Sequence, residues 1–98
     1  MKLKNKYIIL EKLSDDMFGG NHSNGVNVGS IAVQGYALYE PTIGEQFCLF
    51  SSAEDVKIGE AIIPKEQLLT SWTSAVKEIY LENMILKTKN STYKILIK

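Results

Sequence analysis

The sequence predicts an all-β fold, a small β-barrel of six or seven mostly antiparallel strands with one short helical turn, formed by a single domain over residues 1–98. Near both ends of the chain, apolar and polar side chains alternate with a period of two, which is typical of half-buried strands. Between them lies a long β-prone segment that glycines divide. A chain of 98 residues, 45% of them hydrophobic, supports one core but not two.

The two terminal segments are expected to pair and close the barrel. The first strand, Leu3 to Leu13, carries lysine at even positions, which predicts a lysine-rich outer face. In the last strand, Tyr93, Ile95 and Ile97 face one way, and Lys94, Leu96 and Lys98 face the other. Lysine on outer strands commonly prevents edge-to-edge aggregation. The same lysines would also suit an acidic partner or a nucleic-acid backbone.

Glycines mark the second part of the chain. Residues 14–25 are rich in turn formers and include Asn24-Gly25, which predicts a long polar loop. In the segment 26–39, the apolar parity changes at Gly29 and again at Gly35. A bulge or sharp bend at each glycine would reset which side chains face the core.

The remaining elements follow from short apolar runs between turn signals. They are, in order, a turn over 40–44, a strand over 46–50, a loop over 51–55, a short strand over 56–63, a helical turn over 64–69, paired strands over 72–80 and 84–88, and a bend at 90–91. The strand 46–50 is apolar on both faces and is expected to be covered on both, with Cys48 in the core. The helical turn is favoured by Pro64 at its first position.

Composition excludes several function classes. All eleven cations are lysine, which removes the arginine fork used for base-specific DNA readout. One cysteine and one histidine allow neither an internal disulfide nor a zinc site of such ligands. No apolar run approaches the roughly 18 residues of a membrane span, and the N-terminal run is too short for a signal peptide. We therefore expect a cytoplasmic protein without membrane association.

One loop holds residue types that occur in hydrolases. His22 lies beside Ser23 and shortly after Asp15 and Asp16, so a small hydrolase is one hypothesis. A polar loop would not hold the distances that such catalysis needs, which predicts no catalytic residues and no enzyme activity. The glycines match no phosphate-binding motif, and the carboxylate pairs lack EF-hand spacing. We predict no metal site and no cofactor.

The most favoured function is a non-catalytic interaction module that binds another protein or itself. Recognition is expected in the loop Asp15 to Gly25 and in the insertion Ser51 to Thr70, because loops on a rigid scaffold commonly carry it. The candidate binding residues are Asp15, Asp16, Asn21, His22, Asn24, Tyr39 and Trp72. The alternative is a nucleic-acid or nucleotide-binding barrel that uses the terminal lysine strands and aromatic side chains.

Two stretches carry a pattern that resembles short bacterial and phage β-barrel proteins of no assigned role. The stretches are Gly35-x₅-Pro41-x₂-Gly44-x₂-Phe47-x-Leu49, and Thr73-Ser74-x-Val76 with Thr88-x-Asn90-Ser91-x-Tyr93. The first is also similar to the second-domain β-barrel of translation elongation factors. The resemblance implies a barrel fold and a phage or mobile-element setting. The hydroxyl and amide side chains of the second stretch are expected to bond turn backbone and to allow close strand approach.

Overall fold

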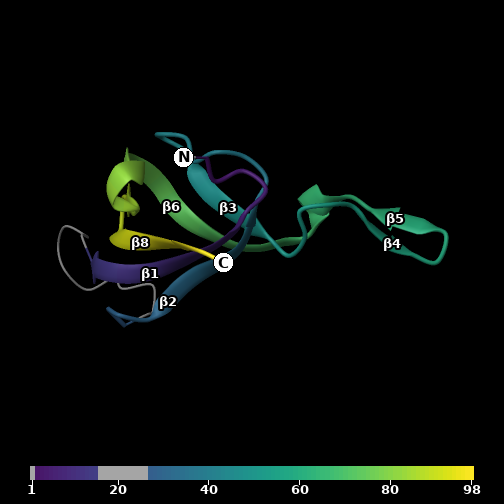
Figure 1. Ribbon diagram of the computed structural model, residues 1–98, viewed down its shortest axis with the longest axis horizontal. Helices are drawn as coiled ribbons and strands as arrows, with labels where there is room; N and C mark the ends of the chain where they lie inside the picture. Colours follow the sequence, from purple (N-terminus) through teal and green to yellow (C-terminus); the bar gives the residue numbers. More distant parts are fainter. Residues whose placement is uncertain (1, 16–26) are drawn as a thin grey trace.

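The computed structural model describes residues 2–15 and 27–98 and is all-β, as predicted. Six antiparallel strands close a barrel in the order β1-β2-β3-β6-β7-β8, and a separate two-stranded hairpin, β4-β5, projects from it (Figure 1). The barrel strands are β1 (Tyr7–Asp15), β2 (Ile31–Ala37), β3 (Gln46–Phe50), β6 (Leu69–Tyr80), β7 (Ile85–Thr88) and β8 (Ser91–Ile97). The hairpin strands are β4 (Val56–Ile58) and β5 (Ala61–Ile63).

The predicted pairing of the two terminal strands is confirmed. β1 pairs with β8 from Ile8 opposite Ile97 to Asp15 opposite Ser91, which closes the barrel. In β8 the expected alternation also holds, because Tyr93 and Ile95 are buried whereas Lys94 and Leu96 are exposed.

The predicted facing and start of β1 are wrong. Its even positions point into the barrel, so Ile8, Leu10 and Lys12 are fully buried. The strand begins at Tyr7 because the preceding chain turns, with Asn5 at φ 67°. Leu3 then enters the core, held by the Glu40 carboxylate, whose Oε1 accepts a hydrogen bond of 2.7 Å from the Leu3 backbone N–H. Of the lysines within the predicted strand 3–13, Lys4 and Lys6, which precede β1, are exposed.

The change of facing predicted at Gly35 does not occur. Val33, Gly35 and Ala37 all face the core, so β2 keeps one alternation. Its bulge lies instead at Ala32. Leu10 of β1 pairs with Val33 and the next residue, Glu11, pairs with Ile31, so the register passes over Ala32. Gly35 is required for another reason: a Cβ there would lie 2.8 Å from the Phe50 carbonyl oxygen on β3, and its φ is +151°.

One face of β3 carries the buried side chains of Phe47 and Leu49. The strand pairs with β2 along one edge and with β6 along the other. Cys48 is half-buried on the outer face, so the expectation that it lies in the core is wrong. Residues 51–68 connect β3 and β6 and contain the hairpin β4-β5.

Helical structure is limited to two short 3-10 turns among the described residues. The first, η1 (Lys65–Gln67), lies where one helical turn was predicted and follows Pro64. The second, η2 (Leu81–Asn83), was predicted only as a connection between β6 and β7. Met84 ends η2 in a left-handed conformation, and the chain turns directly into β7.

Candidate functional site

The predicted binding residues do not form one site. Asp16, Asn21, His22 and Asn24 lie outside the described residues. Among the others, Asp15 ends β1 at one mouth of the barrel, whereas Tyr39 and Trp72 lie near Cys48, which is opposite Trp72 in the β3–β6 register.

Asp15 is part of the barrel rather than of a loop. Its carboxylate forms an ion pair with the ammonium group of Lys12, which is fully buried. The Ser91 hydroxyl donates a hydrogen bond to the same carboxylate at 3.4 Å. A buried charge is stable only where it is paired, so this contact explains how the barrel accommodates a lysine.

Tyr39 and Trp72 are exposed aromatic side chains that each lie near Cys48. Trp72 is 56% exposed and Tyr39 is 38% exposed. Burial and the neighbouring Cys48 thiol raise the pKa of Tyr39 to about 12. Trp72 borders a small hollow of about 260 Å³ whose other lining side chains are uncharged, including Gln46, Ser74 and Asn90. Trp72 therefore offers an exposed aromatic contact beside an uncharged hollow.

Hydrogen bonds of hydroxyl groups join β6, β7 and β8, and we call Ser74, Thr88 and Ser91 the hydroxyl network. Ser74 Oγ donates a hydrogen bond of 2.9 Å to Thr88 Oγ1, which in turn donates one of 3.1 Å to the Ser91 carbonyl oxygen. The Ser91 and Asn90 backbone N–H groups donate to Thr88 Oγ1 and Ser74 Oγ. The two halves of the Thr-Ser and Thr-x-Asn-Ser pattern thus meet, and the expected bonding of these hydroxyl groups to turn backbone is confirmed for Thr88 and Ser74.

The most prominent surface feature is the segment of residues 51–70, which we call the arm and which consists of the connection between β3 and β6 and the first two residues of β6. Its two strands pair from Val56 opposite Ile63 to Ile58 opposite Ala61. Gly59 has a φ of +62°, the left-handed value that a two-residue hairpin loop needs at its first position. The sequence predicted one strand over 56–63, and this glycine is the signal that divides it in two.

The root of the arm is held by local hydrogen bonds. Asp55 Oδ1 accepts one of 3.0 Å from the Lys65 backbone N–H, and the Ser51 backbone N–H donates one of 2.8 Å to the Leu68 carbonyl oxygen. These bonds tie the hairpin to η1 and to the start of β6. The arm is thereby joined to the barrel on both sides, and it accounts for the 50 Å length of a molecule that is only 24 to 29 Å wide (Figure 1).

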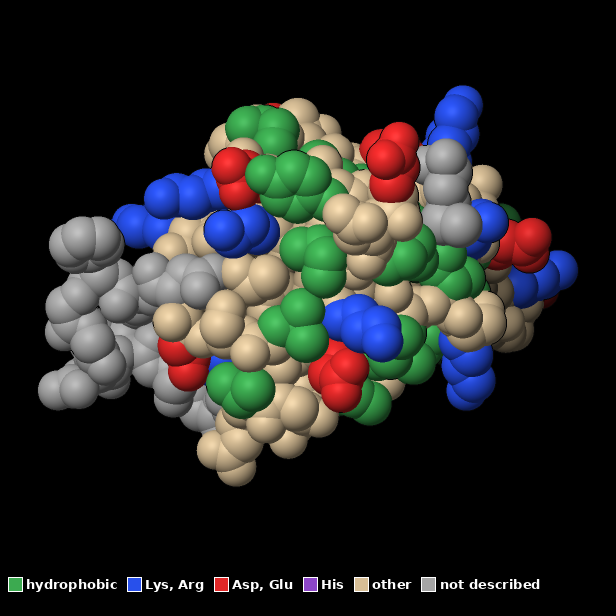
Figure 2. All heavy atoms as spheres, turned by 60° about the vertical axis from the view of Figure 1, so that its left-hand side comes forward, with side chains coloured by type: hydrophobic (Ala, Val, Ile, Leu, Met, Phe, Trp, Pro, Cys, Tyr) green, Lys and Arg blue, Asp and Glu red, His purple; other side chains and the backbone are tan. Residues whose placement is uncertain are grey.

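One face of the arm is apolar throughout. Because directly paired residues share a face of a ribbon, Val56, Ile58, Ala61 and Ile63 lie together. No residue of the arm is buried, and Ile58 on this face is 61% exposed, whereas Ile62 lies beside Lys57 on the opposite face and is 65% exposed. The barrel wall also exposes hydrophobic side chains, but lysine and acidic side chains lie between and around them (Figure 2).

A second surface lies where β1, β2 and the last residues of the chain meet. A hollow of about 630 Å³ is lined by six residues, and we call it the tyrosine hollow: Asn5, Lys6, Tyr7, Tyr36, Ile97 and Lys98. The Tyr7 and Tyr36 rings pack edge to face with centroids 5.1 Å apart, and Lys98 Nζ lies 5.6 Å from the Tyr7 centroid. The sequence did not place these residues together, because their proximity depends on strand register.

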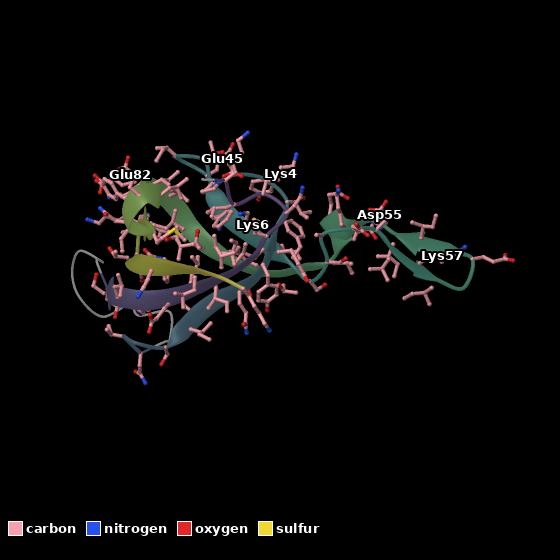
Figure 3. The ribbon with its side chains drawn as sticks, viewed as in Figure 1. Lys4, Lys6, Glu45, Asp55, Lys57 and Glu82 are labelled. Atoms are coloured by element: carbon pink, nitrogen blue, oxygen red, sulfur yellow. The ribbon has the colours of Figure 1, made fainter. Side chains whose placement is uncertain are left out.

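The tyrosine hollow continues to the root of the arm. Tyr7 lines a smaller hollow with Ser51 and Thr70, and Tyr36 lines another with Ser52 and Glu54. Figure 3 shows Lys4 and Lys6 on the N-terminal segment of the barrel, Asp55 near the arm root and Lys57 farther along the arm.

The described residues contain no group of three or more histidine, cysteine or acidic side chains that could hold a metal ion. They also contain no helix of the length and apolar character that a membrane crossing requires. Comparison with protein-family models, curated proteins and solved structures gives no significant match to this chain.

Proposed function

We propose that this chain is a non-catalytic protein-interaction module that binds its partner through the arm. The observation that carries the proposal is the apolar face of a hairpin that has no core behind it. The exposed Ile58 side chain on this face would contribute roughly 1.5–3 kcal/mol if a partner buried it fully. An isolated two-stranded hairpin is marginally stable in water, so a partner would also stabilise the arm.

The charges of the arm restrict the kind of partner. Residues 51–70 contain four acidic side chains and two lysines, so the arm carries a net negative charge. A partner surface that complements it has an apolar centre and a basic rim. The proposal includes the two expectations from the sequence that the protein belongs to a phage or mobile element and that it acts in the cytoplasm.

The test uses a photo-cross-linking benzoylphenylalanine in place of Ile58 in the full chain, produced in its natural host. The matched control carries the same group in place of Ile43, which is 57% exposed but lies outside the arm. We expect a defined protein adduct from position 58 only. The purified partner should then bind the Ile58→Asp variant about tenfold or more weakly than the wild type. Equal adducts from both positions, or none from position 58, would overturn the proposal.

A second candidate function is supported by the tyrosine hollow. Lysines beside aromatic rings suit single-stranded nucleic acid, because the cations contact phosphates and the rings stack on bases. Fluorescence anisotropy with a labelled oligonucleotide would show affinity that falls steeply with salt and is lost in the Lys6→Glu/Lys98→Glu variant. The control is Lys57→Glu, which changes a lysine on the arm. No binding at low salt would exclude this function.

A further inference from the structure

We infer that the partner is a second copy of this chain, with the arm of each copy seated in the tyrosine hollow of the other in a two-fold symmetric dimer. This inference rests on the proposed function, because it names the occupant of the apolar face of the arm.

The two surfaces have complementary chemistry. The arm offers the exposed Ile58 on its apolar face, and it carries acidic side chains, among them Asp55 and Glu60. The tyrosine hollow offers apolar surface from its two tyrosines and Ile97, with Lys6 and Lys98 among its lining residues. Its volume of about 630 Å³ falls in the range of roughly 300–1,000 Å³ in which proteins receive ligand groups. The hollow is therefore large enough to accept the tip of a hairpin and matches it in charge.

The position of the hollow favours a closed dimer over an open chain. Because the hollow continues to the root of the arm, two copies with antiparallel arms would place each arm against the other copy's hollow. Both contacts then form together, which is the self-complementary arrangement of a two-fold interface. A net charge of zero for the whole chain leaves no overall repulsion between the copies.

The arm supplies enough surface for such an interface. A stable dimer buries about 800 Å² per partner, roughly an eighth of the 6250 Å² accessible surface of this molecule. Residues 51–70 form about a fifth of the chain and contain no buried residue, so much of their surface is available. Each copy contributes this arm and also the hollow that receives the partner's arm.

The experiment measures the mass of the full chain in solution by sedimentation velocity over a range of concentrations. The wild type should form a dimer of twice 11.0 kDa that weakens as salt is added. The arm variant Ile58→Asp and the hollow variant Lys6→Glu/Lys98→Glu should each be monomeric, with dissociation constants raised about tenfold or more. Ile43→Asp, at a similarly exposed position outside both surfaces, should dimerise as the wild type does.

Mixing the two monomeric variants gives the most specific readout. The arm variant keeps an intact hollow and the hollow variant keeps an intact arm, so the mixture should form heterodimers with one working contact. Arms that associated with one another would give no such rescue. A wild type that is monomeric at every concentration, or a dimer that survives both variants, would overturn the inference.

These outcomes separate the inference from the proposed function. A monomeric wild type whose position 58 still cross-links to a different protein leaves the interaction module intact and refutes only the second copy as partner. A monomer without any adduct from position 58 refutes both. A monomer that binds an oligonucleotide through Lys6 and Lys98 assigns the tyrosine hollow to the second candidate function instead.

Discussion

The hydroxyl network allows the free energy of one buried side chain to be derived from its contacts. Thr88 is 2% exposed, and its Oγ1 takes part in three hydrogen bonds, from Ser74 Oγ, from the Ser91 N–H and to the Ser91 carbonyl oxygen. Thr88→Val keeps the shape but removes all three. Each bond contributes about 0.5–1.5 kcal/mol, and the Ser91 groups would be left buried without this partner, so we expect a loss of about 3 kcal/mol.

Urea unfolding followed by tryptophan fluorescence measures this loss, because Trp72 is the one tryptophan of the chain. With a slope of about 1.5 kcal/mol/M, the midpoint should fall by about 2 M at an unchanged slope. Thr88→Ser keeps the hydroxyl and should recover most of the loss. Thr42→Val, at an exposed threonine with one weak bond of 3.4 Å, should change stability by less than about 0.5 kcal/mol. A Thr88→Val protein as stable as the wild type would refute the reasoning.

Two further predictions concern stability. Gly35→Ala should cost about 3 kcal/mol, because its Cβ would meet the Phe50 carbonyl oxygen at 2.8 Å in a strained backbone, whereas Gly44→Ala, with open space and φ +90°, should cost about 1 kcal/mol. Thermal unfolding compares the two, and equal losses would contradict the role of close packing. Tyr39, with its pKa raised from about 10 in the unfolded chain to about 12, keeps its proton longer in the folded state, so its stabilising contribution is complete below pH 10 and is lost as pH rises toward 12. Tyr39→Phe should reduce the fall in urea midpoint between about pH 9 and about pH 11, and an identical fall in both proteins would show that another group is responsible.

The candidate surfaces show where sequence reasoning stops. The segment 51–70 was predicted as a place of recognition, and it carries the projecting hairpin; Tyr39 and Trp72, predicted as binding residues, are exposed. The tyrosine hollow was not visible, because it joins residues from both ends of the chain and from β2. The apolar face of the arm depends on which residue of β4 is opposite which residue of β5.

Local alternation and turn chemistry determined, by themselves, that this chain forms strands, where most of them lie and that the two ends pair. Those properties depend on neighbouring residues, so a single sequence contains them. Only the tertiary structure decided which face of β1 is inward, and with it the burial of Lys12 against Asp15. A strand with apolar residues at both parities fits a barrel in either orientation, and the choice depends on the packing of all six strands together.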